Sequence, residues 1–215
     1  MMKKLLTLAL SCAMLLTLSA GTSAQTLDAP PAPTLDAGIK LGYASLTGDK
    51  SDAFDGAISG GLFVNYDISP IFAVQGSWLW HKHDASENAN KVTNFLASES
   101  IGLPALTDVR LTMNDFDVNG KFSYVMPPVT PYLLAGFGLH YWKVDGKTII
   151  GDFDRKQDET FWDFGINFGG GVAYDVTEQV TIGGEIVYTY VFDEFGDGYF
   201  NFLATASYGF SLGGM

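Results

Sequence analysis

Hydrophobic and polar residues alternate one by one over two long segments in the last third of the chain. Every second residue from Trp162 to Tyr174 is large and apolar or glycine, and the residues between are small or polar. The alternation restarts after the turn Asp175–Gln179 and continues from Val180 to Phe192. A period of two predicts β-strands. Soluble strands average about five or six residues, whereas strands of about ten cross a bilayer at a tilt. The pair therefore predicts a transmembrane β-hairpin.

The same alternation recurs along the rest of the chain and predicts eight strands in all. Their approximate ranges are 37–46, 57–66, 71–81, 111–125, 131–142, 160–174, 180–192 and 199–212. Long polar connections, chiefly Lys82–Val109 and Lys143–Glu159, follow the odd-numbered strands, and short turns follow the even-numbered ones. A short helix is conceivable over Asn94–Ser100. Outer-membrane barrels have this asymmetry, with long loops outside and short turns in the periplasm. We expect an all-β fold, an eight-stranded antiparallel transmembrane β-barrel with up-and-down meander order.

Composition separates this fold from a soluble β-sandwich, which would also alternate. The exposed face of a sandwich should be rich in charge. Here only 17% of residues are charged, aromatic residues reach 14%, and the less apolar face is built mostly from glycine and other small residues. No apolar run after the leader is long enough for a transmembrane helix. The composition favours the barrel.

The first 36 residues are expected to lie outside the barrel. Residues 1–24 have the basic start, apolar centre and small-residue cleavage site of a secretory signal peptide. Cys12, the only cysteine, could also suggest a lipoprotein signal, but the apolar segment before it is too short. Residues 25–36 are proline-rich and predict a periplasmic N-terminal segment, either extended or, as we prefer, an ordinary disordered terminus. The domain prediction is thus 1–24 signal peptide, 25–36 periplasmic segment and 37–215 barrel, without disulfides.

The net charge limits the classes of partner that the chain is expected to bind. The chain carries a formal charge of -12, which would become -14 without Lys3 and Lys4 of the leader. Nucleic acid is disfavoured because its phosphates would be repelled. We expect no cofactor, a monomer, contact with outer-membrane lipid and lipopolysaccharide, and any extracellular ligand at the loops.

Several short motifs carry a family resemblance. Val129-Thr130-Pro131-Tyr132 and Gly136-Phe137-Gly138, with the turns Tyr66–Pro70 and Tyr174–Thr177, resemble the Gram-negative outer-membrane β-barrel family, in particular its small OmpA/OmpX/OmpW-like barrels. The last strand is similar to the C-terminal assembly signal of this family, although Ser211–Met215 extends beyond its usual aromatic end. The resemblance implies the bacterial cell outer membrane as the location and leaves the activity open.

Polar side chains on the inward face are the first candidates for function. The period of two assigns eight polar residues to this inward face: Lys40, Gln75, Asp115, Asp117, Lys121, Asp163, Asn167 and Glu185. An eight-stranded barrel is just wide enough for side chains to fill, and buried charges must pair. The expected arrangement is an ion-paired polar plug in which both lysines bridge carboxylates. The alternative is a narrow, cation-preferring passage.

Histidines and acidic loops are further candidates. His81, His83 and His140 with Asp84 could bind a divalent metal, or act as a His/carboxylate pair, but polar rim residues are the preferred interpretation. Three acidic groups should crowd the outer rim, either solvated or bridged by Ca²⁺ or Mg²⁺ to lipopolysaccharide phosphates. They are Asp49, Asp52 and Asp55; Asp152, Asp154, Asp158 and Glu159; and Asp193, Glu194 and Asp197. The aromatic residues at strand ends should form interfacial bands.

These features predict a non-enzymatic surface protein with a structural or adhesion-type role, acting through its extracellular loops. The alternative is a small porin or OmpW-like channel for small or hydrophobic solutes. A lipid-modifying enzyme ranks third.

Overall fold

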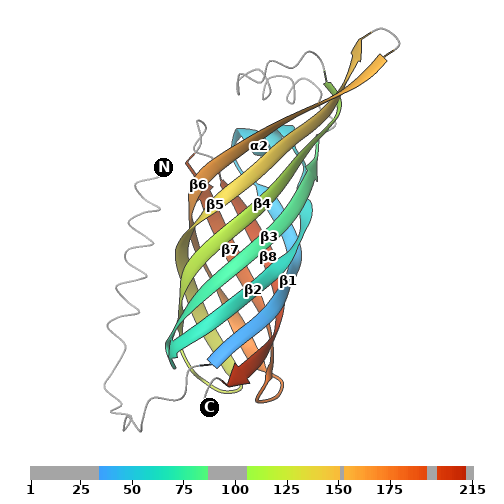
Figure 1. Ribbon diagram of the computed structural model, residues 1–215. Helices are drawn as coiled ribbons and strands as arrows, with labels where there is room; N and C mark the ends of the chain where they lie inside the picture. The colour runs from blue at the N-terminus through green and yellow to red at the C-terminus, as the bar shows by residue number, and fades with distance from the viewer. Residues whose placement is uncertain (1–33, 87–105, 151–152, 193–197, 212–215) are drawn as a thin grey trace. The chain divides into compact units, whose positions relative to one another are not determined.

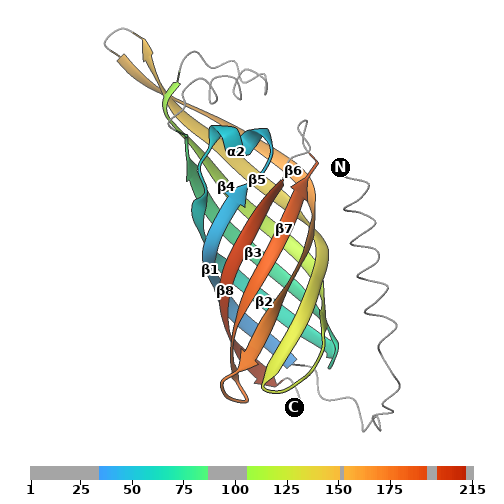
Figure 2. The ribbon, with the colours of Figure 1, turned by 180° about the vertical axis from the view of Figure 1, so that it is seen from behind.

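Eight antiparallel strands close into a barrel in simple chain order, from β1 to β8 (Figures 1 and 2). The computed structural model describes residues 34–86, 106–150, 153–192 and 198–211. All belong to the second of the two compact units of the chain, Met1–Pro30 and Pro31–Met215. The elements are β1 (Thr34–Leu46), α2 (Asp49–Ala53), β2 (Ala57–Ser69), β3 (Phe72–Asp84), β4 (Leu106–Ser123), β5 (Val129–Ile150), β6 (Phe153–Asp175), β7 (Val180–Val191) and β8 (Gly198–Ser211). The predicted all-β meander is confirmed.

The first and last strands complete the barrel. β1 pairs with β8 in unbroken register from Thr34↔Ser211 to Leu46↔Tyr199, and its other edge pairs with β2. A sheet edge in hydrocarbon would leave backbone N–H and C=O groups without partners, at several kcal/mol each. Closure removes both edges, which is why strands can cross a bilayer only in this form.

The outer wall of the barrel is apolar. Ile58 is 78% exposed and Leu41 59%, and large apolar side chains are exposed on every strand of the barrel. A water-soluble monomer rarely exposes contiguous apolar patches larger than a few hundred Å². Hydrocarbon, not water, therefore covers this wall. No helix in the described ranges is long and apolar enough to cross a membrane.

Aromatic side chains mark the two limits of the apolar wall. Toward one limit Trp80, Tyr141 and Trp162 lie in a single cross-strand row, and the last two rings are 5.0 Å apart. Toward the other, Tyr208 contacts Phe210 with ring centroids 5.0 Å apart. Such bands anchor barrels at the membrane interfaces.

The two ends of the barrel differ. We call the end with Thr34, Ser211 and the connections 70–71, 124–128 and 176–179 the turn end. The opposite end, which bears α2 and the tip of the β5–β6 hairpin, is the loop end (Figures 1 and 2). Short turns face the periplasm in outer-membrane barrels. The loop end therefore faces the exterior.

Strand lengths at the loop end differ from the prediction. Lys143–Glu159, expected to be a charged loop, is mostly paired strand, with register continuing to Ile150↔Phe153. Residues 106–110 and 82–84 extend β4 and β3, and the predicted polar loop Thr47–Gly56 contains α2. These segments lie beyond the aromatic row, outside the hydrocarbon, so they lack the apolar alternation by which strands were recognised. The helix considered over Asn94–Ser100 lies outside the described residues.

Candidate functional site

Polar side chains fill the centre of the barrel. The structure places all eight predicted lumen residues on the inward face: Lys40, Gln75, Asp115, Asp117, Asn167 and Glu185 are buried, and Lys121 and Asp163 are half-buried. The period of two puts them there, because their strand neighbours carry the apolar wall. They divide into a lysine-centred network and a histidine-centred network.

Lys40 of β1 is the centre of the first network. Its ammonium lies 2.6 Å from Glu185 Oε1 of β7 and donates to Gln75 Oε1 of β3 at 2.9 Å. Gln75 in turn donates to Asn65 Oδ1 at 3.0 Å, and the Tyr132 hydroxyl donates to Glu185 Oε2 at 3.1 Å. Lys40 is 2% exposed. An ion pair so deeply buried is tolerated only when further hydrogen bonds satisfy both charges, as they do here.

Lys121 differs from the expectation that it bridges carboxylates. Its ammonium lies over the ring of Tyr132, 4.4 Å from the centroid, and no carboxylate of the described residues is within ion-pair distance. Tyr132 thus contacts Lys121 with its ring face and Glu185 with its hydroxyl. Lys40 alone forms the predicted lysine–carboxylate bridge.

Three histidines and Asp115 form the second network, nearer the loop end. One carboxylate oxygen of Asp115 of β4 lies 2.9 Å from His81 Nε2, and the other lies 3.0 Å from His140 Nδ1. His81 Nδ1 lies 2.7 Å from His83 Nε2, and Tyr199 of β8 is 3.0 Å from His140 Nδ1. The three histidines are completely buried. The network ties β3, β4, β5 and β8 together.

Hydrogen bonds connect His83 to the Asp55 carbonyl on one side and to His81 on the other. The carbonyl of Asp55 can only accept, so His83 Nδ1, 2.7 Å away, donates to it. His83 Nε2 and His81 Nδ1 lie 2.7 Å apart, and His81 Nε2 faces the Asp115 carboxylate. The two histidines therefore link Asp55 to Asp115 through an unbroken line of polar contacts.

The metal and catalytic hypotheses find no support in this geometry. Asp84 points outward to Arg110, whose Nε is 3.1 Å from Asp84 Oδ1, while Asp115 takes the place beside the histidines. Among the described side chains, no group of three or more His, Cys, Asp or Glu residues is arranged to hold a metal ion. His81 and His140 contact only protein in this arrangement, since neither has exposed surface.

Several buried polar atoms in the lumen have no hydrogen-bond partner among the described residues, including Asp117 Oδ1, Asn167 Oδ1 and His140 Nε2. Asn167 donates to Asn119 Oδ1 at 3.4 Å. Asp163 accepts a hydrogen bond from the indole of Trp142. Buried water commonly satisfies such groups. The middle of the lumen is therefore lined by buried polar groups.

The segment containing α2 caps the loop end of the lumen. Phe54 is 1% exposed and packs into an apolar cluster with Leu111, Trp142 and Tyr199. Backbone hydrogen bonds from Asp55 N to Asp84 O (3.0 Å) and from Ser86 N to Ala53 O (2.8 Å) fix the segment to the end of β3. The Lys50 ammonium lies 4.9 Å from the Trp142 ring centroid. Together with the bond from His83, these contacts hold the cap over the histidine network.

Two inward glycines leave room for the polar side chains. A Cβ on Gly165 would lie 2.6 Å from His140 Nε2, and a Cβ on Gly171 would lie 2.5 Å from the Tyr132 hydroxyl. Both separations are far below van der Waals contact. The small residues of the inward face are thus required by the large rings opposite them.

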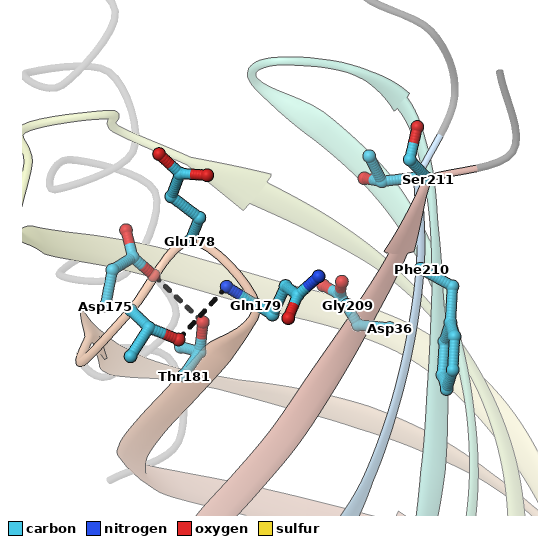
Figure 3. A pocket seen from close by; sticks show the side chains of 10 residues that line it. Asp36, Asp175, Glu178, Gln179, Thr181, Gly209, Phe210 and Ser211 are labelled. Carbon is cyan, nitrogen blue, oxygen red and sulfur yellow. Dashed lines mark hydrogen bonds between the residues drawn. The ribbon is translucent and has the colours of Figure 1, made fainter. Parts of the chain in front are cut away.

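A pocket of about 590 Å³ lies at the turn end (Figure 3). The β6–β7 turn and the adjacent strand ends contribute Asp175, Glu178, Gln179 and Thr181, which face Gly209 and Ser211 at the end of β8. Thr181 donates to Asp175 Oδ1 at 2.9 Å. The pocket is open to solvent and acidic. It is the periplasmic mouth of the barrel and not an enclosed binding cavity.

Sequence reasoning omitted several residues that complete these networks. They are Asn65, Tyr132, Trp142 and Tyr199. Each lies an odd number of positions along its strand from a residue that was correctly assigned to the outward face. The alternation of side chains was therefore sufficient to place it inward. The side chains of the acidic groups at 152–159 and 193–197 lie outside what the structure describes.

The lipid-facing wall, closed strand order and filled polar interior define the class of outer-membrane β-barrel proteins. The sequence profile of the outer membrane protein beta-barrel domain matches residues 10–213. The chain belongs to this family, and its location is the bacterial outer membrane.

Solved structures show the same architecture. Neisserial surface protein A is 19% identical, with TM-score 0.53, over 85% of this chain and 100% of that one. The attachment invasion locus protein Ail of Yersinia pestis is 15% identical, with TM-score 0.52, over 84% and 99%. A major outer membrane protein from Thermus thermophilus is 11% identical, with TM-score 0.58, over 83% and 99%. No curated protein matches the chain. At these identities the likeness concerns the fold alone.

Proposed function

We propose that this protein is a surface-interaction barrel that contacts an extracellular partner through the sheet projecting from its loop end. The observation that carries the proposal is the length of the central strands. Pairing of β4 with β5 continues to Leu106↔Thr148, and pairing of β5 with β6 to Ile150↔Phe153. At ~3.3 Å per residue, the hairpin extends about 30 Å along its strands beyond the Tyr141–Trp162 row. The projection is visible in Figures 1 and 2.

The projecting sheet has an open edge. β6 pairs with β7 only from Gly165↔Val191 toward the turn end, and the amide of Phe192 makes one more bond to the carbonyl of Phe164. Beyond this point, Phe153–Asp163 has no partner strand on this edge among the described residues. Unpaired backbone N–H and C=O groups can bind an extended segment of another protein by strand addition. The edge supports an adhesion-type contact.

The interior supports a surface role over solute passage. Side chains of all the networks above meet across the lumen, and the α2 segment covers the loop end with Phe54 buried beneath it. An eight-stranded barrel has little space beyond its own side chains. Two of the structural neighbours are named for surface or attachment roles, which are properties of those proteins.

A shortened hairpin tests the proposal. Replacing Lys147–Lys156 with Asn-Gly joins Gly146 to Gln157, which are paired in register, and two-residue Asn-Gly turns suit such a hairpin. The buried Val144 is kept. Bacteria displaying the full or shortened barrel are compared for adhesion to host cells and to one another, with an empty-vector strain as baseline.

We expect the full barrel to increase adhesion and the shortened one to lose most of that increase. Equal surface amounts and the heat-dependent gel mobility of a folded barrel are the controls. Adhesion equal to the empty vector for the full barrel, or equal adhesion for both barrels, would refute the role of the hairpin.

A further inference from the structure

Among the side chains that the structure describes, outward-facing basic residues lie in one place on the barrel. Within the described side chains, the other lysines, Lys40, Lys50 and Lys121, point inward or pack beneath the cap. Lys82, Arg110 and Lys143 remain, and they lie on the adjacent strands β3, β4 and β5. For a chain with a net charge of -12, this clustering on one wall is notable because the surroundings are acidic.

The register places these cations just beyond the aromatic row. Trp80, Asn114, Tyr141 and Trp162 are paired across four strands, and the next outward row is Lys82, Thr112, Lys143 and Thr160. We call this second row the donor row, since each of its side chains can donate a hydrogen bond. Two residues along a strand rise ~7 Å, and the tilt reduces this to about 5 Å along the membrane normal. The donor row therefore lies at the depth of lipid headgroups.

Acidic neighbours lie farther out than the donor row. Asp84 and Asp145 share the next row with Arg110. Asp84 pairs with Arg110 Nε at 3.1 Å, and Asp145 lies 3.1 Å from the Lys143 ammonium. The side chains of Arg110 and Asp84 are 52% and 76% exposed, so water weakens their pairing. Lys82 is exposed and forms no ion pair with a described residue. Lys82 and Lys143 thus lie nearer the membrane than the two carboxylates, whereas Arg110 shares the outer row with them.

The opposite wall lacks such a row among its described residues. Outward residues near the loop end of β1, β7 and β8 are Tyr43, Phe192 and Phe200. A general attraction to lipid would need only these aromatic anchors. The β3–β5 wall adds ammonium and hydroxyl donors, and those groups match phosphate.

We propose that the donor row, with Arg110, binds phosphate groups of lipid headgroups in the outer leaflet, in particular those of the lipid A part of lipopolysaccharide. The ammonium groups of Lys82 and Lys143 pair with phosphate oxygens, and the hydroxyls of Thr112 and Thr160 donate between them. The acyl chains of the same lipid then lie against the apolar wall below Trp80 and Trp162. This lipid contact is independent of the protein partner proposed for the projecting hairpin.

The test uses the mature chain folded in nonionic detergent micelles. It is titrated with diphosphoryl lipid A and, separately, with the same lipid after removal of its phosphates. Trp80 and Trp162 adjoin the donor row, so tryptophan fluorescence reports binding. Lys82→Gln/Lys143→Gln removes both ammonium groups, whereas Lys82→Arg/Lys143→Arg keeps the charge.

The parent should bind the diphosphoryl lipid more tightly than the dephosphorylated one. Each cation near an anionic headgroup is worth about fivefold in affinity, so the glutamine pair should lose about 25-fold. The arginine pair should bind nearly as the parent does, and Asp84→Asn should bind more tightly because it removes a repelling charge. Heat-dependent gel mobility shows that each variant is folded.

Equal affinity of the parent for both lipids would overturn the proposal, because the acyl chains would then account for binding. Unchanged affinity in the glutamine pair would also overturn it. If the glutamine pair does not fold, Asp84→Asn decides: tighter binding of the diphosphoryl lipid supports the proposal, and unchanged binding refutes it.

Discussion

Replacing Lys40 should have the largest effect of any single change in the lumen. Lys40→Met keeps most of the length of the side chain and removes its charge, so the loss is mainly electrostatic rather than due to a cavity. Glu185 would keep only the Tyr132 hydroxyl, and Gln75 Oε1 would lose its donor. Removing one partner of a buried ion pair costs about 3–5 kcal/mol because the remaining charge stays buried without compensation. We expect a loss of this size in the free energy of unfolding.

Reversible urea unfolding in detergent micelles or lipid vesicles measures this loss, followed by tryptophan fluorescence and heat-dependent gel mobility. Two variants serve as controls. Lys40→Met/Glu185→Gln removes both charges and should recover most of the stability. Lys121→Met removes a half-buried lysine whose observed contact is the Tyr132 ring, and should cost about 1 kcal/mol. If Lys40→Met costs no more than Lys121→Met, or the double variant is no better than the single one, the buried-pair reasoning fails.

Three further predictions concern the lumen and its loop end. His83→Ala removes the donor to the Asp55 carbonyl, so the Asp55 amide should exchange with solvent about 10-fold faster as the cap opens. His83→Asn, which keeps a donor, is the control. Unchanged exchange in His83→Ala would contradict the role of the His83–Asp55 hydrogen bond in holding the cap. Gly165→Ala should destabilise the barrel by about 1–3 kcal/mol because its methyl group overlaps His140, whereas full stability in urea would show that the ring moves freely. Planar-bilayer recordings of the parent should show no current steps, and stable conductance would require a path through the lumen.

The repeating alternation was sufficient for much of this structure. It identified the eight strands, the meander and the inward position of all eight lumen residues, since side-chain direction depends only on parity. The lengths of β5 and β6 were wrong by many residues. Beyond the aromatic row these strands no longer border hydrocarbon, so Lys143–Glu159 resembles a loop in composition and yet stays paired through its backbone.

The sequence could not predict which inward side chains contact one another inside the barrel. Parity placed Lys40 and Lys121 in the same lumen, but the cross-barrel distances put Glu185 beside the first and the Tyr132 ring beside the second. Asp84 was grouped with the histidines through sequence proximity, although alternate residues on a strand point to opposite faces and Asp115 was the real neighbour.

The sequence by itself determined that this chain forms a closed membrane barrel, because a period-two apolar pattern in strands of this length has one stable solution in lipid. The tertiary structure alone decided how the interior charges pair, where the α2 cap sits and which wall carries the donor row. Those features depend on contacts between strands far apart in sequence. The shear and closure of the barrel set such contacts, and no local pattern encodes them.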